Sequence, residues 1–455
     1  MKKNDQGQKA DRNRHMKDDP VFPLLVSMGV PMAISMLANS LYNIVDSYFV
    51  ANFSGNAMTA LSLVFPIQNV ITAIGVGFGV GINSVIAQAL GAQKQERADA
   101  AATQGVLLSA IHGLIINVVC ILIMPAFLGL YTSDPVILRY GMQYSVVVFC
   151  FSVIVNLQMA YQKIFQAVGR MKMSMTAMLL GCGINILIDP LLIFGPGPLP
   201  RLGVIGAALG TGISQSISLA YYLINYHRLD FELTITKKHI KPDKEICGRL
   251  YSIGTAAALN TFLPSVLTGA LNAILVSFSA SYVFVLGVYY RLQNFLYMTA
   301  SGFVQGMRPL AAYNYGAKEK SRVWKIFVCT IFVIGGIMAF GVLMCLFAAG
   351  PLMRLFSENQ EIIETGITAF RIMCIGFIPS AVSVAATGAL EALGKGIPSL
   401  IISILRYAAV IIPAAYLMSR LCGAVGVWHA FWIAEIITAA CAFVIFKRVF
   451  NKSMI

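Results

Sequence analysis

Four acidic side chains stand inside long apolar stretches of the sequence, where carboxylates are rare. They are Asp46, Asp189, Glu391 and Glu435, out of nineteen acidic residues in the 455-residue chain. An ionisable group buried among apolar residues costs several kcal/mol, so each needs a partner or a function. Asp46 and Asp189 each lie a few residues before the end of their stretch. Two helices that run in the same direction would therefore hold them at similar depth.

Asp189 has a polar neighbour on its own stretch. Asn185 lies four residues earlier and therefore shares its helix face. Pro190 follows directly and frees a backbone carbonyl on the preceding turn. Asp46, Asn185 and Asp189 could thus form an oxygen-rich pocket that suits hydrated Na⁺ or a proton shared between two carboxyl groups. The alternative is that the two acids only cap loops near the helix ends.

The other charges inside apolar stretches favour structural roles. Arg406 and Glu435 each lie near the middle of a stretch, which predicts a buried ion pair between neighbouring helices. A role in ion coupling is the alternative for this pair. Glu391 lies at the end of its stretch and is predicted to be structural. Arg308 is predicted to extend its charged end to the polar rim of the membrane.

Recognisable enzyme chemistry is missing from the sequence. There is no GxxxxGK[ST] loop, so ATP is not expected to drive this chain directly, and there is no HExxH motif or clustered Ser, His and Asp. The nine cysteines show no CxxC or Cys/His metal spacing, and most lie in apolar segments as small buried hydrophobes. We therefore expect no enzyme activity and no cofactor or resident metal beyond Na⁺.

The elements that must position these residues are membrane helices. Hydrophobic residues make up 58% of the chain and charged residues 11%, against about 25% charged in soluble domains. Crossing a bilayer takes roughly 20 apolar residues, and a helix satisfies its own backbone. We predict an all-α integral membrane protein with twelve transmembrane helices. They lie at 21–50, 60–88, 103–129, 137–165, 173–195, 203–226, 249–277, 281–312, 323–350, 364–390, 397–419 and 425–446.

Positive charge predicts the orientation. With the N-terminus in the cytoplasm, 24 of the 33 Lys and Arg residues fall in cytoplasmic segments and four on the opposite side. We therefore expect both termini on the cytoplasmic side of the bacterial inner (plasma) membrane. The net charge of +14 lies in loops, so no nucleic-acid partner is expected. The predicted segments are a tail at 1–20, lobes at 21–226 and 249–446, a cytoplasmic linker at 227–248 and a second tail at 447–455.

The two halves repeat. At a shift of 225 residues, positions 27–97 contain sixteen identities, including Gln68-Asn69 opposite Gln293-Asn294. Each half has an even number of helices, so the repeat is parallel and relates two six-helix lobes by a pseudo-two-fold axis along the membrane normal. Two such lobes enclose a cleft, and alternating exposure of that cleft is typical of transporters. Tyr42, Gln68, Asn69 and Gln293 are the candidate residues of a substrate cavity.

The acids distinguish the two halves. Asp46 lies opposite Leu271 in the repeat, and Asp189 has no acidic counterpart near Pro413. The scaffold therefore repeats, while coupling chemistry is predicted in the first lobe alone. The glycine-rich runs GVGFGVG (75–81), GCG (181–183) and GAALGTG (206–212) are interpreted as close helix packing.

Several of these motifs resemble one family in order. GMRPLAAYNYGAKEKSRV, its first-half mirror GINSVIAQALGAQKQERA, LYNIVDSYFV, FQAVGR, NILIDPLLIF and GAALGTGISQ are similar to motifs of the multidrug and toxic compound extrusion (MATE) family. The resemblance covers residues 20–448. It implies two six-helix lobes and export of organic cations, drugs and dyes in exchange for H⁺ or Na⁺. It also implies a coupling site of Asp46, Asn185, Asp189 and Thr211.

The sequence also leaves other transport sites and functions open. Another branch of the family uses acids on helices 7 and 10, which this chain lacks except for Glu391 at the edge of helix 10. A flippase for lipid-linked precursors would need cationic cavity residues, and Arg291, Arg308, Arg371 and Arg406 keep it open. A membrane-embedded enzyme is a third alternative, but the sequence shows no recognisable nucleophile or metal motif for one. The expected partners are membrane lipid and small-molecule drugs or toxins, the energy source is an ion gradient, and the chain is expected to act as a monomer.

Overall fold

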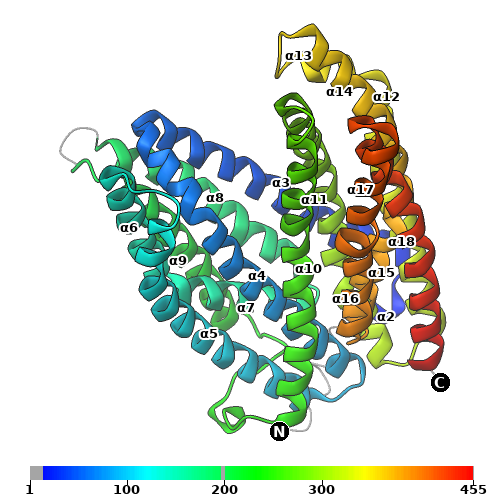
Figure 1. Ribbon diagram of the computed structural model, residues 1–455. Helices are drawn as coiled ribbons and strands as arrows, with labels where there is room; N and C mark the ends of the chain where they lie inside the picture. Colours follow the sequence, from blue (N-terminus) through cyan, green and yellow to red (C-terminus); the bar gives the residue numbers. More distant parts are fainter. Residues whose placement is uncertain (1–13, 196–199, 454–455) are drawn as a thin grey trace, which may run out of the picture. The chain divides into compact units, whose positions relative to one another are not determined.

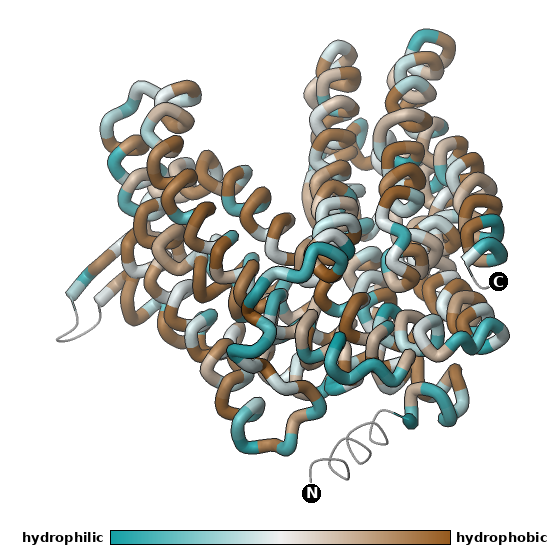
Figure 2. The backbone as a smooth tube through the Cα atoms, turned by 90° about the horizontal axis from the view of Figure 1, so that it is seen from below, coloured by the Kyte–Doolittle hydropathy of each residue, from teal (hydrophilic) through white to brown (hydrophobic). Residues whose placement is uncertain are grey.

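The computed structural model describes residues 14–195 and 200–453, and nearly all of them are helical (Figure 1). Residues 1–13 of the predicted tail at 1–20 lie outside the described residues. The same holds for residues 454–455 of the predicted C-terminal tail and for 196–199 of the loop after the fifth span. Figure 2 shows hydrophobic colour along the long helices and hydrophilic colour at many of the connections between them.

Long helices follow one another with short connections. In chain order they are α2 (His15–Asp18), α3 (Val21–Phe53), α4 (Gly55–Gly91), α5 (Gln95–Gly129), α6 (Pro135–Cys150), α7 (Ser152–Ala167), α8 (Met171–Phe194), α9 (Val204–Arg228), η1 (Lys237–His239), α10 (Lys244–Val276), α11 (Ala280–Gly316), α12 (Lys320–Phe347), α13 (Ala349–Arg354), α14 (Gln360–Met373), η2 (Cys374–Gly376), α15 (Phe377–Ala392), α16 (Gly396–Ile404), η3 (Leu405–Ala409), α17 (Ile411–Cys422) and α18 (Ala424–Ser453). Each predicted stretch coincides closely with one helix or with consecutive helices.

The predicted fold class, an all-α membrane protein, is confirmed. In the described part of the chain, ten helical spans are long and apolar enough to cross a membrane, or eleven if the bent pair α6 and α7 forms one span. The remaining predicted stretch, 281–312, lies in α11, which is 37 residues long but contains Arg291, Arg308 and several amides. Those polar residues lower its hydropathy, and they do not shorten the helix.

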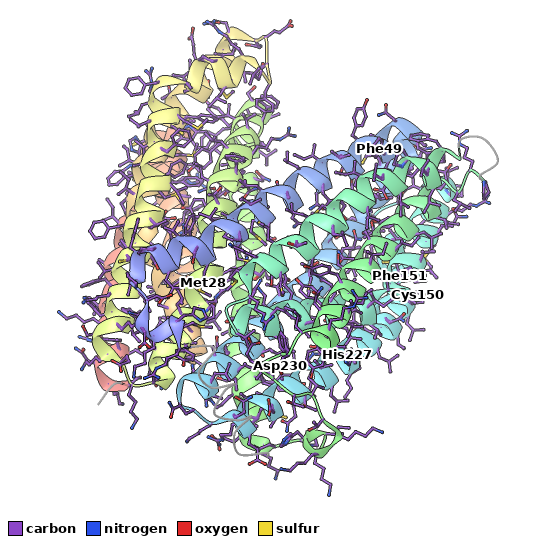
Figure 3. The ribbon with its side chains drawn as sticks, turned by 180° about the vertical axis from the view of Figure 1, so that it is seen from behind. Met28, Phe49, Cys150, Phe151, His227 and Asp230 are labelled. Carbon is purple, nitrogen blue, oxygen red and sulfur yellow. The ribbon has the colours of Figure 1, made fainter. Side chains whose placement is uncertain are left out.

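The bend between α6 and α7 occurs at one bulky residue. The two helices meet at 46° on either side of Phe151, next to Cys150, where both are labelled in Figure 3. The Phe151 ring lies against Gly212 of α9, where any Cβ would overlap it. Gly212 thus makes room for the ring that fills the bend.

Contacts divide the chain into two compact units. Unit 1 takes Ile34–Ala258 and, among the described residues, also Arg14 and His15; unit 2 takes Met16–Ala33 together with the chain from Leu259 onward. Within unit 1, α8 packs on α9, and α4 packs on α5 and α7. Within unit 2, α17 packs on α18, and α11 packs on α12 and α15. The predicted lobe boundaries stay a prediction, and the units depart from them at the first parts of α3 and α10.

Glycines explain how the first part of α10 is held in unit 1. A Cβ on Gly77 of α4 would lie 2.5 Å from the backbone nitrogen of Ala258 and 2.6 Å from the carbonyl oxygen of Gly254. One turn along, a Cβ on Gly81 would lie 2.5 Å from the carbonyl oxygen of Leu250. Two helices approach this closely only where side chains are absent.

The same crossing recurs in unit 2, 225 residues apart in the chain. Gly302 of α11 lies against the backbone of Ala33, and a Cβ on Gly306 would lie 2.7 Å from the Cα of Gly29. Gly302 and Gly306 are the repeat partners of Gly77 and Gly81. This close helix crossing is therefore part of the internal repeat. In each half, the first part of the first helix belongs to the unit that is formed mainly by the other half.

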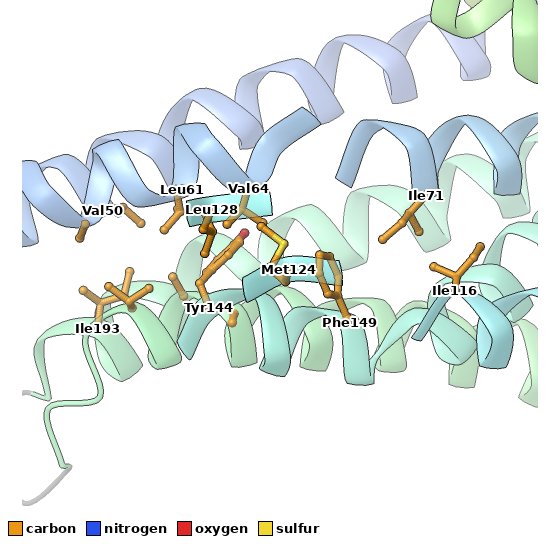
Figure 4. Close-up of a cluster of buried hydrophobic side chains, with 14 residues drawn as sticks. Val50, Leu61, Val64, Ile71, Ile116, Met124, Leu128, Tyr144, Phe149 and Ile193 are labelled. Atoms are coloured by element: carbon orange, nitrogen blue, oxygen red, sulfur yellow. The ribbon is translucent and has the colours of Figure 1, made fainter. Parts of the chain in front are cut away.

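An apolar cluster packs one end of unit 1. Buried side chains from α3, α4, α5, α6, α8 and α9 meet there (Figure 4): Val50, Leu61, Val64, Ile71, Ile116, Met124, Leu128, Tyr144, Phe149 and Ile193 are labelled. Lipid tails are as apolar as these side chains, so the cluster stabilises the unit mainly through close packing. It fixes the helices that carry the acids described below.

The linker between the halves is fastened to unit 1. Arg170 makes a bidentate ion pair with Glu232, with its Nη2 2.8 Å from Oε1, and Glu232 is buried. The side chain of Gln104 on α5 donates to the carbonyl oxygen of Lys241 at 3.1 Å, and Asp99 accepts from the backbone nitrogen of Thr234 at 2.8 Å. The segment predicted as a connecting loop is therefore bound along the start of α5.

Candidate functional site

Asp46 of α3 and Asp189 of α8 come together within unit 1. Their carboxyl groups lie close enough to interact with each other. Asn185, one turn before Asp189, donates from Nδ2 to Asp189 Oδ1 at 3.0 Å. Asp189 is fully buried and Asn185 is 1% exposed. The four-residue spacing seen in the sequence thus produces the expected amide–carboxyl contact.

Three oxygens of this cluster lack a hydrogen-bond partner. They are Asp46 Oδ1, Asn185 Oδ1 and Asp189 Oδ2. Buried polar atoms are nearly always paired, so three unpaired acceptors in one place leave room for a positive group. Two carboxylates accept hydrogen bonds and donate none, so their mutual contact needs a proton. The chemistry of the site therefore suits either a shared proton or a small cation held by oxygen atoms.

Tyr42 links this cluster to α9. Its side chain interacts with Thr211, and it interacts electrostatically with Asp46, Asp189 and Tyr144. The structure therefore brings together all four predicted coupling residues, through α3, α8 and α9. Thr211 therefore reaches the acids through Tyr42.

Sequence reasoning missed Tyr144 of α6. Its hydroxyl accepts a hydrogen bond from Nε2 of Gln68, on α4, at 3.1 Å. Tyr144 is buried in the apolar cluster and interacts with the charges of Asp46 and Asp189. No spacing marks it in the sequence, since it lies on a helix that carries no acid. The only available signal was a tyrosine inside a predicted membrane span.

The other predicted cavity residues are more scattered. Gln68 is half-buried beside Tyr144, and Asn69 is exposed on the same helix. Gln293 lies on α11 in unit 2, where its Nε2 donates to the hydroxyl of Tyr289 at 3.4 Å. In the described part of the chain, no group of three or more His, Cys, Asp or Glu side chains could hold a metal ion.

Arg406 and Glu435 face each other in unit 2. Arg406 donates from Nε and Nη2 to Glu435 Oε1 at 2.8 and 2.7 Å, and from Nη2 to the Tyr297 hydroxyl at 2.6 Å. Its guanidinium carbon lies 5.0 Å from the ring centre of Tyr297 and 5.1 Å from that of Tyr407. Arg406 belongs to the π-helical turn η3 between α16 and α17. The pair neutralises both charges inside the unit.

Glu391 and Arg308 form a second neutralised pair in unit 2. Arg308 Nη2 donates to Glu391 Oε2 at 2.7 Å, so Arg308 does not simply extend to the rim as expected. Nδ2 of Asn260 and the Ser399 hydroxyl donate to the other oxygen, Oε1, at 2.8 and 3.2 Å. The guanidinium of Arg308 is therefore held by a carboxylate that already has two polar neighbours, instead of extending alone to the polar rim.

Comparison with known proteins places this arrangement in a family. A family model described as MatE matches residues 31–191 and again 256–417, and the two matches begin at the 225-residue shift of the internal repeat. The chain is 29% identical over 439 residues to the multidrug export protein MepA of Staphylococcus haemolyticus, covering 96% of each chain. It is 28% identical over 442 residues to MepA of Staphylococcus aureus, again covering 96% of each.

Solved structures show the same fold. A MOP superfamily transporter from Pyrococcus furiosus superposes with a TM-score of 0.89 at 23% identity, covering 96% of this chain and 98% of that one. An outward-facing multidrug resistance MATE family transporter superposes with a TM-score of 0.90 at 23% identity, covering 97% and 98%. Since the family model matches well over half of the sequence, the resemblance drawn from the motifs is confirmed, and this chain belongs to the MatE family of membrane transporters, which are not enzymes.

Proposed function

We propose that this chain is a secondary active multidrug efflux antiporter. It exports amphipathic, mainly cationic compounds by alternating access, in exchange for H⁺ or Na⁺. It works as a monomer in the bacterial plasma membrane with both termini in the cytoplasm, and it uses an ion gradient and no cofactor. The names of its relatives, multidrug export proteins, support the substrate class.

One observation carries the proposal. Of the four acids predicted inside the spans, Glu391 and Glu435 each pair with an arginine. In the described residues, Asp46 and Asp189 form no ion pair with a basic side chain and instead contact each other. An uncompensated acid pair in a membrane is costly, so it marks a place where a mobile cation is taken up and released.

The acid pair can couple ion binding to a change of shape. With a cation or proton between them, Asp46 and Asp189 stay close and their unpaired oxygens are satisfied. Without it, the two carboxylates repel each other, and α3 and α8 are favoured in another arrangement. A ligand shifts a conformational equilibrium only by its difference in affinity for the two states. Cation binding would favour one state and drug binding the other, which produces exchange.

The flippase alternative gains no support. It required cationic side chains available for phosphate groups. Of the four arginines, Arg308 and Arg406 instead donate to buried carboxylates. Arg291 lies over the ring of Phe356 at 5.5 Å, and Arg371 is exposed on α14. Arginines whose charge is already neutralised make poor phosphate ligands.

Efflux of ethidium from proteoliposomes tests the proposal, with Na⁺ and H⁺ gradients imposed separately. The variant Asp189→Asn keeps the shape of the side chain and removes the charge. We expect it to fold, as checked by gel filtration, and to lose gradient-driven efflux. Glu358→Gln, at an exposed position outside the site, is the control and should behave like the parent. Full gradient-driven efflux by Asp189→Asn would refute the coupling role.

A further inference from the structure

The glycine-rich run at 206–212 lies directly on the helix that carries Asp189. At the first contact, a Cβ on Gly206 would lie 2.5 Å from the backbone carbonyl group of Leu192. One turn later, a Cβ on Gly210 would overlap Oδ1 of Asp189 and lie 3.2 Å from its Cγ. The two glycines therefore differ: Gly206 meets only backbone, whereas Gly210 meets the carboxylate itself.

The carboxylate at this contact is the one that is fully buried and half-unsatisfied. Asp189 Oδ1, the oxygen beside Gly210, accepts from Asn185, while Oδ2 has no hydrogen-bond partner. The wall provided by Gly210 therefore limits how the carboxylate can turn. A group larger than hydrogen at Gly210 would have to displace Oδ1 from Asn185 or turn Oδ2 away from the cluster.

We infer that Gly210 is a positioning residue that sets the cation affinity of the site through Asp189. The inference rests on the proposed function, because Asp189 must bind the coupling ion for its position to matter. Gly210 contacts no cation in this scheme. Because Gly210 has no side chain, α9 leaves space at this turn for Oδ1 of Asp189. The carboxylate can therefore keep its hydrogen bond from Asn185 while Oδ2 stays available to a cation.

The chain offers two matched controls for Gly210→Ala. Gly206→Ala adds the same methyl group to the same face of the same helix and disturbs the packing of α8 on α9 without touching the carboxylate. Gly183→Ala adds a methyl group to α8, six residues before Asp189, at a position with nothing within 4 Å. Comparison of the three variants separates an effect on Asp189 from loss of helix packing.

The experiment measures ethidium efflux from proteoliposomes as a function of cation concentration. Na⁺ is titrated at fixed pH, and pH is titrated without Na⁺, after equal amounts of monodisperse protein are reconstituted. A misplacement of about 1 Å can cost about 100-fold in the rate of a positioned reaction, and we expect a smaller effect on the affinity of a bound cation. We expect Gly210→Ala to raise the half-maximal concentration of the driving cation at least about tenfold and to change the maximal rate about twofold or less.

The controls decide between explanations. Gly183→Ala should match the parent, and Gly206→Ala should lower the yield of folded protein without moving the half-maximal concentration. An unchanged half-maximal concentration in Gly210→Ala, with Asp189→Asn uncoupled, would overturn the positioning role and leave the proposed function standing. An equal shift in Gly206→Ala would also overturn it, because packing alone would then explain the result. Normal coupling in Asp189→Asn would instead refute the proposed function.

Discussion

Replacing Glu435 with glutamine removes the only carboxylate that the structure shows paired with Arg406. The arginine would then stay in the interior of unit 2, where its side chain is 7% exposed, with a full charge and no counter-charge in contact. Its hydrogen bonds to the hydroxyls of Tyr297 and Tyr407, at 2.6 and 3.2 Å, would remain. The variant therefore isolates the value of the negative charge.

The size of the effect follows from these contacts. Removal of one partner of a buried ion pair destabilises a protein by about 3–5 kcal/mol, because the other charge is left uncompensated. Each ring face that Arg406 retains is worth about 0.5–2 kcal/mol. We therefore expect Glu435→Gln to cost about 3 kcal/mol, at the lower end of that range. The apolar double variant Arg406→Met with Glu435→Met should recover most of the loss, since replacement of both partners of a buried pair by apolar side chains of similar volume is often nearly neutral.

Thermal unfolding in detergent, followed by the fraction of monodisperse protein, provides the measurement. Membrane proteins often unfold irreversibly, so all variants must be heated at one rate and compared by apparent Tm. The single variant should lose stability clearly and the double variant should regain it. If Glu435→Gln is as stable as the parent, or the double variant is no better than the single one, the pair is not what stabilises this part of unit 2.

Two further outcomes follow from contacts elsewhere in the chain. Gly302→Ala should destabilise the protein by about 1–3 kcal/mol, because its Cβ would overlap the backbone at Ala33. Gly335→Ala adds a methyl group where nothing lies within 4 Å, so it should leave the stability unchanged. The apparent Tm in detergent compares the two variants, and equal values would contradict the close crossing. Arg170→Ala should expose the linker to trypsin, since Glu232 loses its bidentate partner; the rate of cleavage between the halves measures this, and a rate like that of the parent would show that the backbone hydrogen bonds alone hold the segment.

The helices were predictable because one physical demand dominates their sequence. A bilayer requires long apolar runs, and each run in the chain coincides with a helix or consecutive helices. The contact between Asn185 and Asp189 was predictable for an equally local reason, since residues four apart share a helix face. The similar depth of Asp46 and Asp189 predicted only that the two side chains could meet. The resemblance to a family then implied that both belong to one coupling site.

Pairings between distant helices were not predictable from single residues. Arg308 lies 83 residues from Glu391, and nothing local indicates which acid it will meet. The contact of Gly210 with Asp189 was not predictable for a different reason. A glycine in an apolar run indicates close helix packing, but it does not indicate which residue of the neighbouring helix lies against it. Tyr144 was missed because its role depends on α4 and α6 lying side by side, which hydropathy does not specify.

The exchange of first-helix segments between the units has a consequence for biosynthesis. Residues 21–33 leave the ribosome early, yet the glycines that receive them, Gly302 and Gly306, are synthesised about 270 residues later. At 5–20 residues per second, that is a delay of roughly 15–50 s. Unit 1 is likewise incomplete until the start of α10 has been made. Neither half, made alone, would therefore contain all the helix segments of one unit.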